Sequence, residues 1–208
     1  GDVPAQVPYG ADLFTTRPES KLLDVAAKKR FASLAMKVHY LASRSRPDLK
    51  LCASHFSMKI LNPDEDDWLK LRRVGCYLLG TLDRGLVFAP GDLVLRAQVD
   101  ASNLLPDGKA LMGYTFYLGT QATAPFATRC SKHKSVPTSS THAELMALFR
   151  SLKDLLPHRR LCAEIGISQG LPTKCGQDNQ STIKIAEKGS GFAGKTKHFA
   201  PALFWVSE

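Results

Sequence analysis

The amino-acid sequence predicts an α+β protein with a mixed sheet. Helical patterns fill roughly the first 80 residues, several short apolar runs of strand type follow, and helical and strand patterns then alternate. A strand-rich region that passes into such alternation is typical of α+β folds. With 208 residues, 44% of them hydrophobic, the chain has enough apolar material for one or two domains.

The N-terminal part divides into an irregular stretch and two helices. Residues 1–26 contain several Pro and Gly residues and little apolar periodicity, so they are predicted to form a linker or an extended arm. Apolar residues recur at helical spacing from Ala26 to Ala42, which predicts an amphipathic helix that ends before Pro47. A second helix is predicted from Pro47 to Ile60.

A third helix has the clearest start signal. Asn62 can act as its cap, Pro63 suits the first helical position, and Glu65 stands where a capping box needs an acid. The helix is predicted to run to about Leu79. Its outward-facing cations are Lys70, Arg72 and Arg73. Cations on such a face either remain solvated or contact a polyanion.

The strand-rich part begins after Gly80. Strands are predicted at residues 85–88, 93–99, 113–118, 122–130 and 173–177. Between the last two lies a long helical pattern that Pro157 interrupts or ends, and a further helix is predicted at 179–188, followed by a flexible loop at 189–194. The sequence therefore predicts a helical segment at 27–84 and a mixed domain at 85–208.

Charge and cysteine content narrow the function classes. A net charge of +9 favours a polyanionic partner, with nucleic acid first, although many basic proteins bind none. Five cysteines without a CxxC pair argue against a disulfide framework and a structural zinc site. No membrane-spanning stretch and no signal-peptide pattern is present, so we expect a soluble intracellular protein, cytoplasmic, nuclear or organellar. Because Gly1 replaces an initiator Met, we also expect a piece of something longer.

Three acids stand where predicted elements begin or end: Asp100, Glu144 and Asp178. Each has a purely structural alternative, since Asp100 can open a turn, Glu144 can complete a capping box with Thr141, and Asp178 can cap the following helix. If the acids converge, they need a cation between them. Carboxylate oxygens suit Mg²⁺ or Mn²⁺, and two such ions promote phosphodiester hydrolysis.

Successive motifs of the chain follow one family's order. They are Arg46-Pro47-Asp48-Leu49, Asn62-Pro63 with Trp68, Gly80-Thr81-Leu82-Asp83 with Gly85-Leu86-Val87-Phe88, Gly113-Tyr114 through Leu118-Gly119, Ser139-Ser140-Thr141 with Ala143-Glu144 and Met146-Ala147-Leu148, Asp178-Asn179-Gln180-Ser181, and Thr196-Lys197-His198. From about residue 30 onward the chain resembles the reverse transcriptase connection and ribonuclease H domain of copia-type (Pseudoviridae) LTR retrotransposon polyproteins.

The resemblance implies a ribonuclease H-like five-stranded mixed sheet with flanking helices, preceded by a small helical connection. It implies an endonuclease that cleaves the RNA strand of RNA/DNA hybrids, as part of a reverse transcriptase polyprotein. Asp100 would bridge two Mg²⁺ or Mn²⁺ ions, while Glu144 and Asp178 would each hold one side of the pair. The expected partners are the hybrid and the reverse transcriptase domain of the same polyprotein.

The resemblance also suggests residues around the acids. His198 would lie at the rim of the catalytic site; the alternative for a lone His is a packed or solvated side chain. The residues expected to contact nucleic acid are Lys132, Lys134, Ser140, Asn179, Gln180, Lys195 and Lys197, with His133 beside them. For the lysines, dispersed surface charge is the alternative.

Two segments depart from the family pattern. The family's usual Asp-Ala-Asp-Trp is Asp100-Ala101-Ser102-Asn103 here, a change that is common in other ribonuclease H branches, and a second change lies near the end of the chain. After Lys197-His198 the family has a hydrophobic residue and a fourth Asp, whereas this chain has Phe199 and Ala200. Ala cannot ligate a metal, so the second metal site is expected to be weakened. The alternative function is therefore a catalytically impaired ribonuclease H-like module, repurposed as a structural or nucleic-acid-binding subunit of a host complex.

Overall fold

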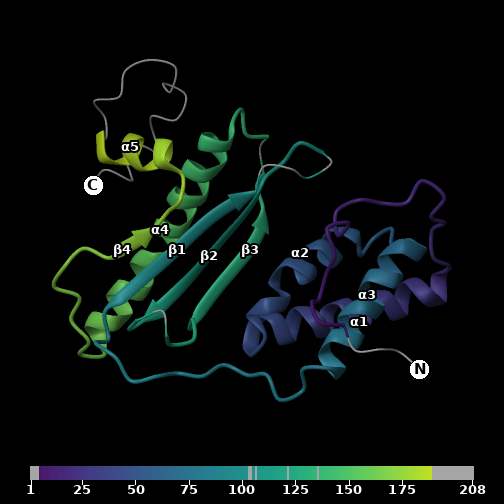
Figure 1. Ribbon diagram of the computed structural model, residues 1–208, viewed down its shortest axis with the longest axis horizontal. Helices are drawn as coiled ribbons and strands as arrows, with labels where there is room; N and C mark the ends of the chain where they lie inside the picture. Colours follow the sequence, from purple (N-terminus) through teal and green to yellow (C-terminus); the bar gives the residue numbers. More distant parts are fainter. Residues whose placement is uncertain (1–4, 103–104, 106, 121, 135, 189–208) are drawn as a thin grey trace. The chain divides into compact units, whose positions relative to one another are not determined.

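The protein folds into two compact units, Gly1–Leu86 and Val87–Glu208, in a computed structural model (Figure 1). The structure describes residues 5–102, 105, 107–120, 122–134 and 136–188. The predicted loop at 189–194 lies outside these residues. Within the described residues, no helix combines the length and the apolarity that crossing a bilayer requires.

The first unit is helical. It contains α1 (Val25–Arg44), a 3-10 turn η1 (Pro47–Leu49), α2 (Lys50–Lys59) and α3 (Glu65–Leu79). Its core lies between these helices, where the rings of Phe31 and Phe56 meet edge to face with centroids 5.9 Å apart. Val74 and Tyr77 bring the buried face of α3 into the same core. The predicted helices therefore exist, and their apolar faces pack against one another.

The start of α3 corrects two details of the sequence interpretation. The cap is Asp64, not Asn62: the Asp64 carboxylate accepts from the Asp67 N–H at 2.8 Å, and the Asp67 carboxylate accepts from the Asp64 N–H at 3.2 Å. Lys70, predicted to face outward, is 8% exposed and pairs with Asp66 at 2.9 Å. It also donates to the Thr15 carbonyl, because the N-terminal stretch covers this side of α3.

A polar network joins η1 to the C-terminal end of α3 in the helical unit. The Asp48 carboxylate accepts from Arg46 at 2.8 Å and from the Tyr77 hydroxyl at 2.7 Å. Burial alone raises the pKa of Asp48, but these hydrogen bonds outweigh it and hold that pKa below its usual value. Arg46 also donates to the Thr81 carbonyl, so the network ties η1 to the end of α3.

The second unit is a four-stranded mixed sheet, in the described residues, with two helices. The strands are β1 (Leu95–Ser102), β2 (Leu111–Leu118), β3 (Ala127–Lys132) and β4 (Lys174–Gly176), in the order β3-β2-β1-β4. β2 is antiparallel to β1 and β3, and β4 is parallel to β1. The α+β class with a mixed sheet is confirmed, while the described part of the chain has four strands rather than the implied five.

Helix α4 (Ser140–Glu164) lies along the sheet, and α5 (Gln180–Lys188) follows β4 (Figure 1). Leu148 and Leu155 of α4 pack against Leu95 and Phe116 of the central strands. α4 continues through Pro157, which stands at an exposed position. This packing holds α4 against β1 and β2. The buried face of α4 therefore points toward the sheet.

The predicted strand at 85–88 is wrong. These residues form no strand, and Val87 and Phe88 are exposed. The Val87 carbonyl accepts a hydrogen bond from the Ala124 N–H, which lies outside any strand. The residues have β-type side chains, but strand formation also needs a partner edge, which the sequence pattern does not reveal. The third strand likewise begins at Ala127 rather than at 122.

Candidate metal centre

Three acids from distant parts of the sequence meet at one edge of the sheet. Asp100 lies near the end of β1, paired with Gly113 of β2. Asp178 follows β4, which runs parallel to β1 and therefore ends at the same edge. Glu144 lies near the start of α4. One carboxylate oxygen from each acid can be chosen so that all three lie within 4.8 Å of one another.

None of the three acids serves the local role that each had as an alternative. Asp100 is a strand residue, not a turn residue. The cap of α4 is Ser139, whose side chain accepts from the His142 N–H at 3.1 Å, so Glu144 completes no box with Thr141. Asn179 accepts from the Thr182 N–H at 2.9 Å and caps α5 in place of Asp178. Secondary structure therefore does not explain why these carboxylates converge.

Within the part of the chain that the structure describes, no cationic side chain pairs with the acid cluster. Glu144 is 6% exposed, whereas Asp100 and Asp178 are exposed. Burial raises the pKa of Glu144 above its usual value, and the charges of Asp100 and Asp178 raise it further. Grouped oxygen ligands without a protein counter-charge are able to bind a metal cation.

Gln177 is a site residue that the sequence did not single out. Its amide nitrogen donates to Glu144 Oε2 at 3.2 Å, and its amide oxygen accepts from the Asn179 N–H at 3.0 Å. It thus links the turn between β4 and α5 to the buried carboxylate. Its place directly before Asp178 is the only signal in the sequence, and a glutamine there indicates no particular partner.

A second network holds α4 at a fixed position on the sheet. The Tyr114 hydroxyl of β2 donates to the Asp154 carboxylate of α4, and Arg129 of β3 pairs with the same carboxylate at 3.0 Å. Burial, together with the bond to Asp154, raises the pKa of Tyr114 to about 12, so the hydroxyl keeps its proton. Because β2 and β3 both form polar contacts with Asp154 of α4, polar contacts as well as apolar packing hold the helix that carries Glu144.

The loop before β4 is held to the edge of β1. The Gln169 amide accepts from the Leu95 N–H at 2.8 Å and donates to the Leu93 carbonyl at 2.9 Å, as a neighbouring strand would. Arg159 of α4 donates to the Gln169 carbonyl at 2.8 Å and to Thr173 Oγ1 at 2.5 Å. These contacts set the position at which β4 begins, and therefore where Asp178 emerges.

The residues expected to contact nucleic acid have different surroundings. Lys132 forms an ion pair with Asp107, and Lys134 is exposed after β3. Ser140 and Gln180 are exposed first residues of α4 and α5, and Asn179 serves as the cap of α5. The remaining predicted site residues, Lys195, Lys197 and His198, lie outside the described residues, as does Ala200.

Comparison with known proteins identifies the relatives of the chain. It is 32% identical to the retrovirus-related Pol polyprotein from transposon RE2 of Arabidopsis thaliana over 166 residues. That alignment covers 78% of this chain. The chain is 27% identical over 183 residues to the corresponding polyprotein from transposon TNT 1-94 of Nicotiana tabacum, which covers 88% of this chain. The chain is similar to copia-type retrotransposon Pol polyproteins.

The chain corresponds to a small part of those proteins. It spans 11% of the RE2 polyprotein and 14% of the TNT 1-94 polyprotein. The RE1 polyprotein of Arabidopsis thaliana is 29% identical to it and is likewise covered over 11% of its length. No family model matches the chain. The copia-type resemblance of the motifs is confirmed, and it extends over both the helical unit and the sheet unit.

Proposed function

We propose that the chain is a metal-dependent endonuclease that cleaves the RNA strand of RNA/DNA hybrids within a retrotransposon reverse transcriptase polyprotein. The observation that carries this proposal is the convergence of Asp100, Glu144 and Asp178, which no local structural role explains. Similarity to retrovirus-related Pol polyproteins of transposons supports it, as does the resemblance of the motifs to the ribonuclease H domain of copia-type polyproteins. The net charge of +9 also suits a polyanionic substrate.

The donor set fits Mg²⁺ or Mn²⁺. All three donors are carboxylate oxygens, no thiol or imidazole joins the cluster among the described residues, and burial disfavours an uncompensated charge on Glu144. When bound, such ions activate a water and stabilise the leaving oxygen in an attack on phosphorus. We propose that Asp100 ligates from the strand, with Glu144 and Asp178 on either side.

The chain's own residues would set the geometry of the reaction. Asp100 lies in β1 and is paired with Gly113 of β2, which restrains its backbone position. Gln177 restrains the carboxylate of Glu144. The carboxylate would therefore lose less conformational entropy when it binds a metal. The exposed Lys134, Ser140 and Gln180 are proposed to contact the phosphate backbone, which positions a hybrid without reading its sequence.

A second candidate function rests on one residue. Ala200 stands where the resembling family has a fourth Asp, so one metal would lack a ligand. On this alternative the domain binds nucleic acid, or packs within a host complex, without cleaving. Retention of three carboxylates at one sheet edge favours the active enzyme, because mutual repulsion and the burial of Glu144 disfavour such a cluster unless it binds a cation.

The test is incubation of the full chain with an end-labelled RNA/DNA hybrid and Mg²⁺ or Mn²⁺, beside Asp178→Asn. Glu164→Gln is the matched control, since it removes an exposed carboxylate from the far end of α4. We expect metal-dependent cleavage of the RNA strand by the wild type and the control, and a loss of at least about 100-fold in Asp178→Asn. Binding without cleavage by all three proteins would refute the nuclease and favour the second candidate.

A further inference from the structure

A glutamine of β1 lies against a glycine of β4 beside the candidate metal centre. Gln98 and Gly176 are paired in the parallel register of the two strands. Side chains alternate between the two faces of a sheet, and the adjacent Ala97 belongs to the core that contains side chains of α4. Gln98 and its partner Gly176 therefore lie on the opposite face. Asp100 stands two residues after Gln98, and Asp178 stands two residues after Gly176.

The amide of Gln98 occupies the space that a side chain at position 176 would need. A Cβ built on Gly176 would lie 2.6 Å from Gln98 Cδ and 2.7 Å from its Nε2, and closer still to its Oε1. Cβ atoms essentially never come this close to other heavy atoms, so only glycine fits while the amide keeps its place. The φ angle of Gly176 is not positive, so space, and not backbone conformation, requires the glycine.

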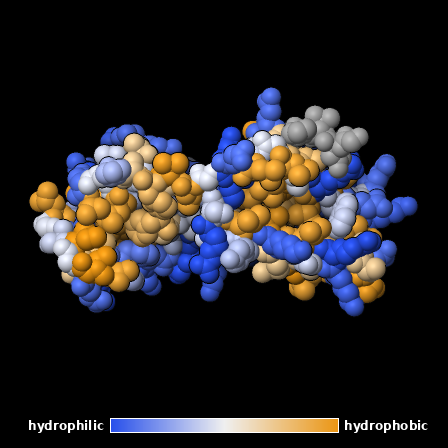
Figure 2. Space-filling model, turned by 90° about the horizontal axis from the view of Figure 1, so that it is seen from below, coloured by the Kyte–Doolittle hydropathy of each residue, from blue (hydrophilic) through white to orange (hydrophobic). Residues whose placement is uncertain are grey.

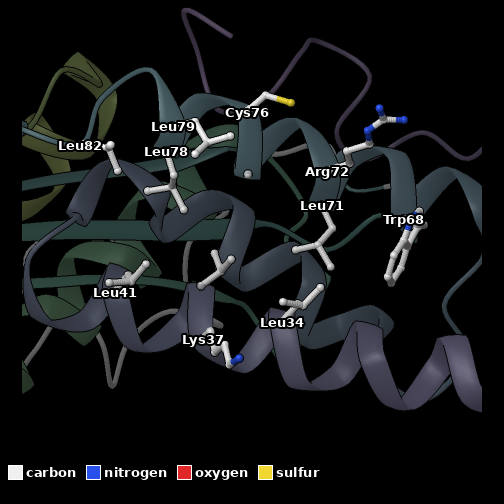
Figure 3. A pocket seen from close by; sticks show the side chains of 12 residues that line it. Leu34, Lys37, Leu41, Trp68, Leu71, Arg72, Cys76, Leu78, Leu79 and Leu82 are labelled. Carbon is white, nitrogen blue, oxygen red and sulfur yellow. The ribbon is translucent and has the colours of Figure 1, made fainter. Parts of the chain in front are cut away.

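Two other glycines lack this overlap. Gly75 lies in the interior of α3 and lines an apolar groove between α1 and α3 (Figure 3). That groove belongs to the helical unit, where apolar side chains gather in the space-filling view (Figure 2). A Cβ at Gly75 meets nothing within 4 Å, and one at Gly113, the pair partner of Asp100, meets its nearest neighbour at an ordinary 3.6 Å. The overlap at Gly176 is therefore specific to its contact with Gln98.

The neighbours of Gln98 in the sheet explain why its amide lies toward β4. Along β1 the neighbours on the same face are Arg96 and Asp100, and on β2 the pair partner is Thr115. Each of these three residues carries a side chain, whereas Gly176 carries none. Among the paired positions around Gln98, only Gly176 therefore leaves room for the amide. An alanine there would push either the amide off the sheet or β4 away from β1.

The end of β4 is held by few backbone contacts. β4 has three register pairs with β1, whereas β1 and β2 share eight, and the described ladder does not continue past Gly176. On the side of α4, the Gln177 amide donates to Glu144. On the opposite face, the Gln98 amide covers Gly176. The point at which Asp178 leaves the sheet therefore depends on side-chain contacts made by two glutamines.

We propose that Gln98 and Gly176 are positioning residues that set the separation of Asp100 and Asp178, and that this separation favours Mg²⁺ over Ca²⁺. The inference rests on the proposed metal centre. Mg²⁺ requires near-ideal geometry, with ligand distances of about 2.0 to 2.1 Å, whereas Ca²⁺ accepts about 2.3 to 2.6 Å in flexible arrangements. A small shift of Asp178 relative to Asp100 would therefore weaken Mg²⁺ binding more than Ca²⁺ binding.

The test measures metal affinity on the full chain, by Mn²⁺ titration followed with electron paramagnetic resonance and by displacement with Mg²⁺ and with Ca²⁺. Gly176→Ala is expected to lose at least about tenfold in affinity for Mg²⁺ and at most about threefold for Ca²⁺. A general loss of stability would weaken both ions alike. Gly170→Ala, in the loop before β4, is the matched control, because a Cβ there meets nothing within 4 Å.

A double variant identifies the contact responsible. Gln98→Ala removes the amide and keeps the glycine, and is expected to cost about threefold in Mg²⁺ affinity with little change for Ca²⁺. In the Gln98→Ala background, Gly176→Ala should cost less than about twofold more, because its Cβ no longer meets the amide. Hydrogen exchange of β1 and α4 amides in chelator verifies that the sheet unit is folded, with α3 of the helical unit as internal reference.

Three results would overturn the proposal: equal Mg²⁺ affinity of the wild type and Gly176→Ala, equal losses for Mg²⁺ and Ca²⁺, and an undiminished cost of Gly176→Ala in the Gln98→Ala background. If Gly176→Ala leaves the β1 amides unprotected, an unchanged ratio of Mg²⁺ to Ca²⁺ affinity in Gln98→Ala overturns it. A wild type that binds none of these ions saturably would refute the metal centre and this proposal together, whereas the other results leave the metal centre standing.

Discussion

The acid cluster makes an unusual stability prediction: Glu144→Gln should stabilise the sheet unit when divalent cations are removed. Gln has nearly the shape of Glu, and its amide oxygen is able to accept from Gln177 as the carboxylate does. The substitution removes one charge, and it also replaces one of the two acceptor oxygens, which receive hydrogen bonds from Gln177 and from the Ala101 backbone, by an NH2 group. The charge it removes is buried and lies close to two other acids.

The magnitude follows from the separation. Carboxylate oxygens within 4.8 Å of one another repel by about 1 kcal/mol per pair in a water-like medium and about 3 kcal/mol at the effective dielectric of a protein surface. Asp100 and Asp178 are exposed, so the lower figure applies to each, and screening reduces it further. We therefore expect Glu144→Gln to gain about 1 to 2 kcal/mol in the presence of a chelator at neutral pH.

Divalent cation should reverse this order. At a Mn²⁺ concentration about 100 times the dissociation constant, the wild type gains about 2.7 kcal/mol, whereas a variant that has lost a ligand gains much less. Because the two units can unfold separately, the readout is hydrogen exchange of β1 and α4 amides. Glu164→Gln, an exposed acid on the same helix, should keep the full Mn²⁺ response. A Glu144→Gln protein that is destabilised in chelator and still responds fully to Mn²⁺ would refute the reasoning.

Three further predictions concern single contacts. Gln177→Leu, which removes the donor to Glu144, should weaken Mn²⁺ binding about tenfold by calorimetric titration, and unchanged affinity would show that Gln177 does not position the carboxylate. The pKa of Asp48 is lowered in the folded protein, so its stabilising contribution is complete above about pH 4 and is lost as pH falls through that folded pKa. In urea unfolding, the free energy of unfolding of Asp48→Asn should therefore fall less on acidification than that of the wild type. Gly75→Ala should stabilise the helical unit by about 0.5 to 1 kcal/mol in the same assay, whereas destabilisation would mean that folding requires this glycine.

Helix positions and the acid cluster were accessible from the sequence because both leave periodic or positional signals. Apolar spacing predicted a helix at 26–42, and the structure has it at Val25–Arg44. The acids were singled out because they stand where predicted elements begin or end, and strand ends are where α/β folds keep their sites. Their convergence required a topology that periodicity alone does not supply.

The errors concern contacts that form only in three dimensions. Asn62 and Asp64 are both suitable helix caps, and only the backbone geometry selects Asp64. Lys70 has the polarity of a surface residue, but the N-terminal stretch covers it. The role of Gln177 depends on a neighbouring side chain from another element. No spacing rule identifies a residue of this kind.

Manganese binding measured by electron paramagnetic resonance tests the central claim most directly, because it reports bound ions without requiring turnover. Titration of the full chain should show saturable Mn²⁺ binding that Asp100→Asn weakens at least about tenfold and that Mg²⁺ displaces. If the wild type and Asp100→Asn bind Mn²⁺ equally, or neither binds it saturably, then the three acids do not form a metal centre.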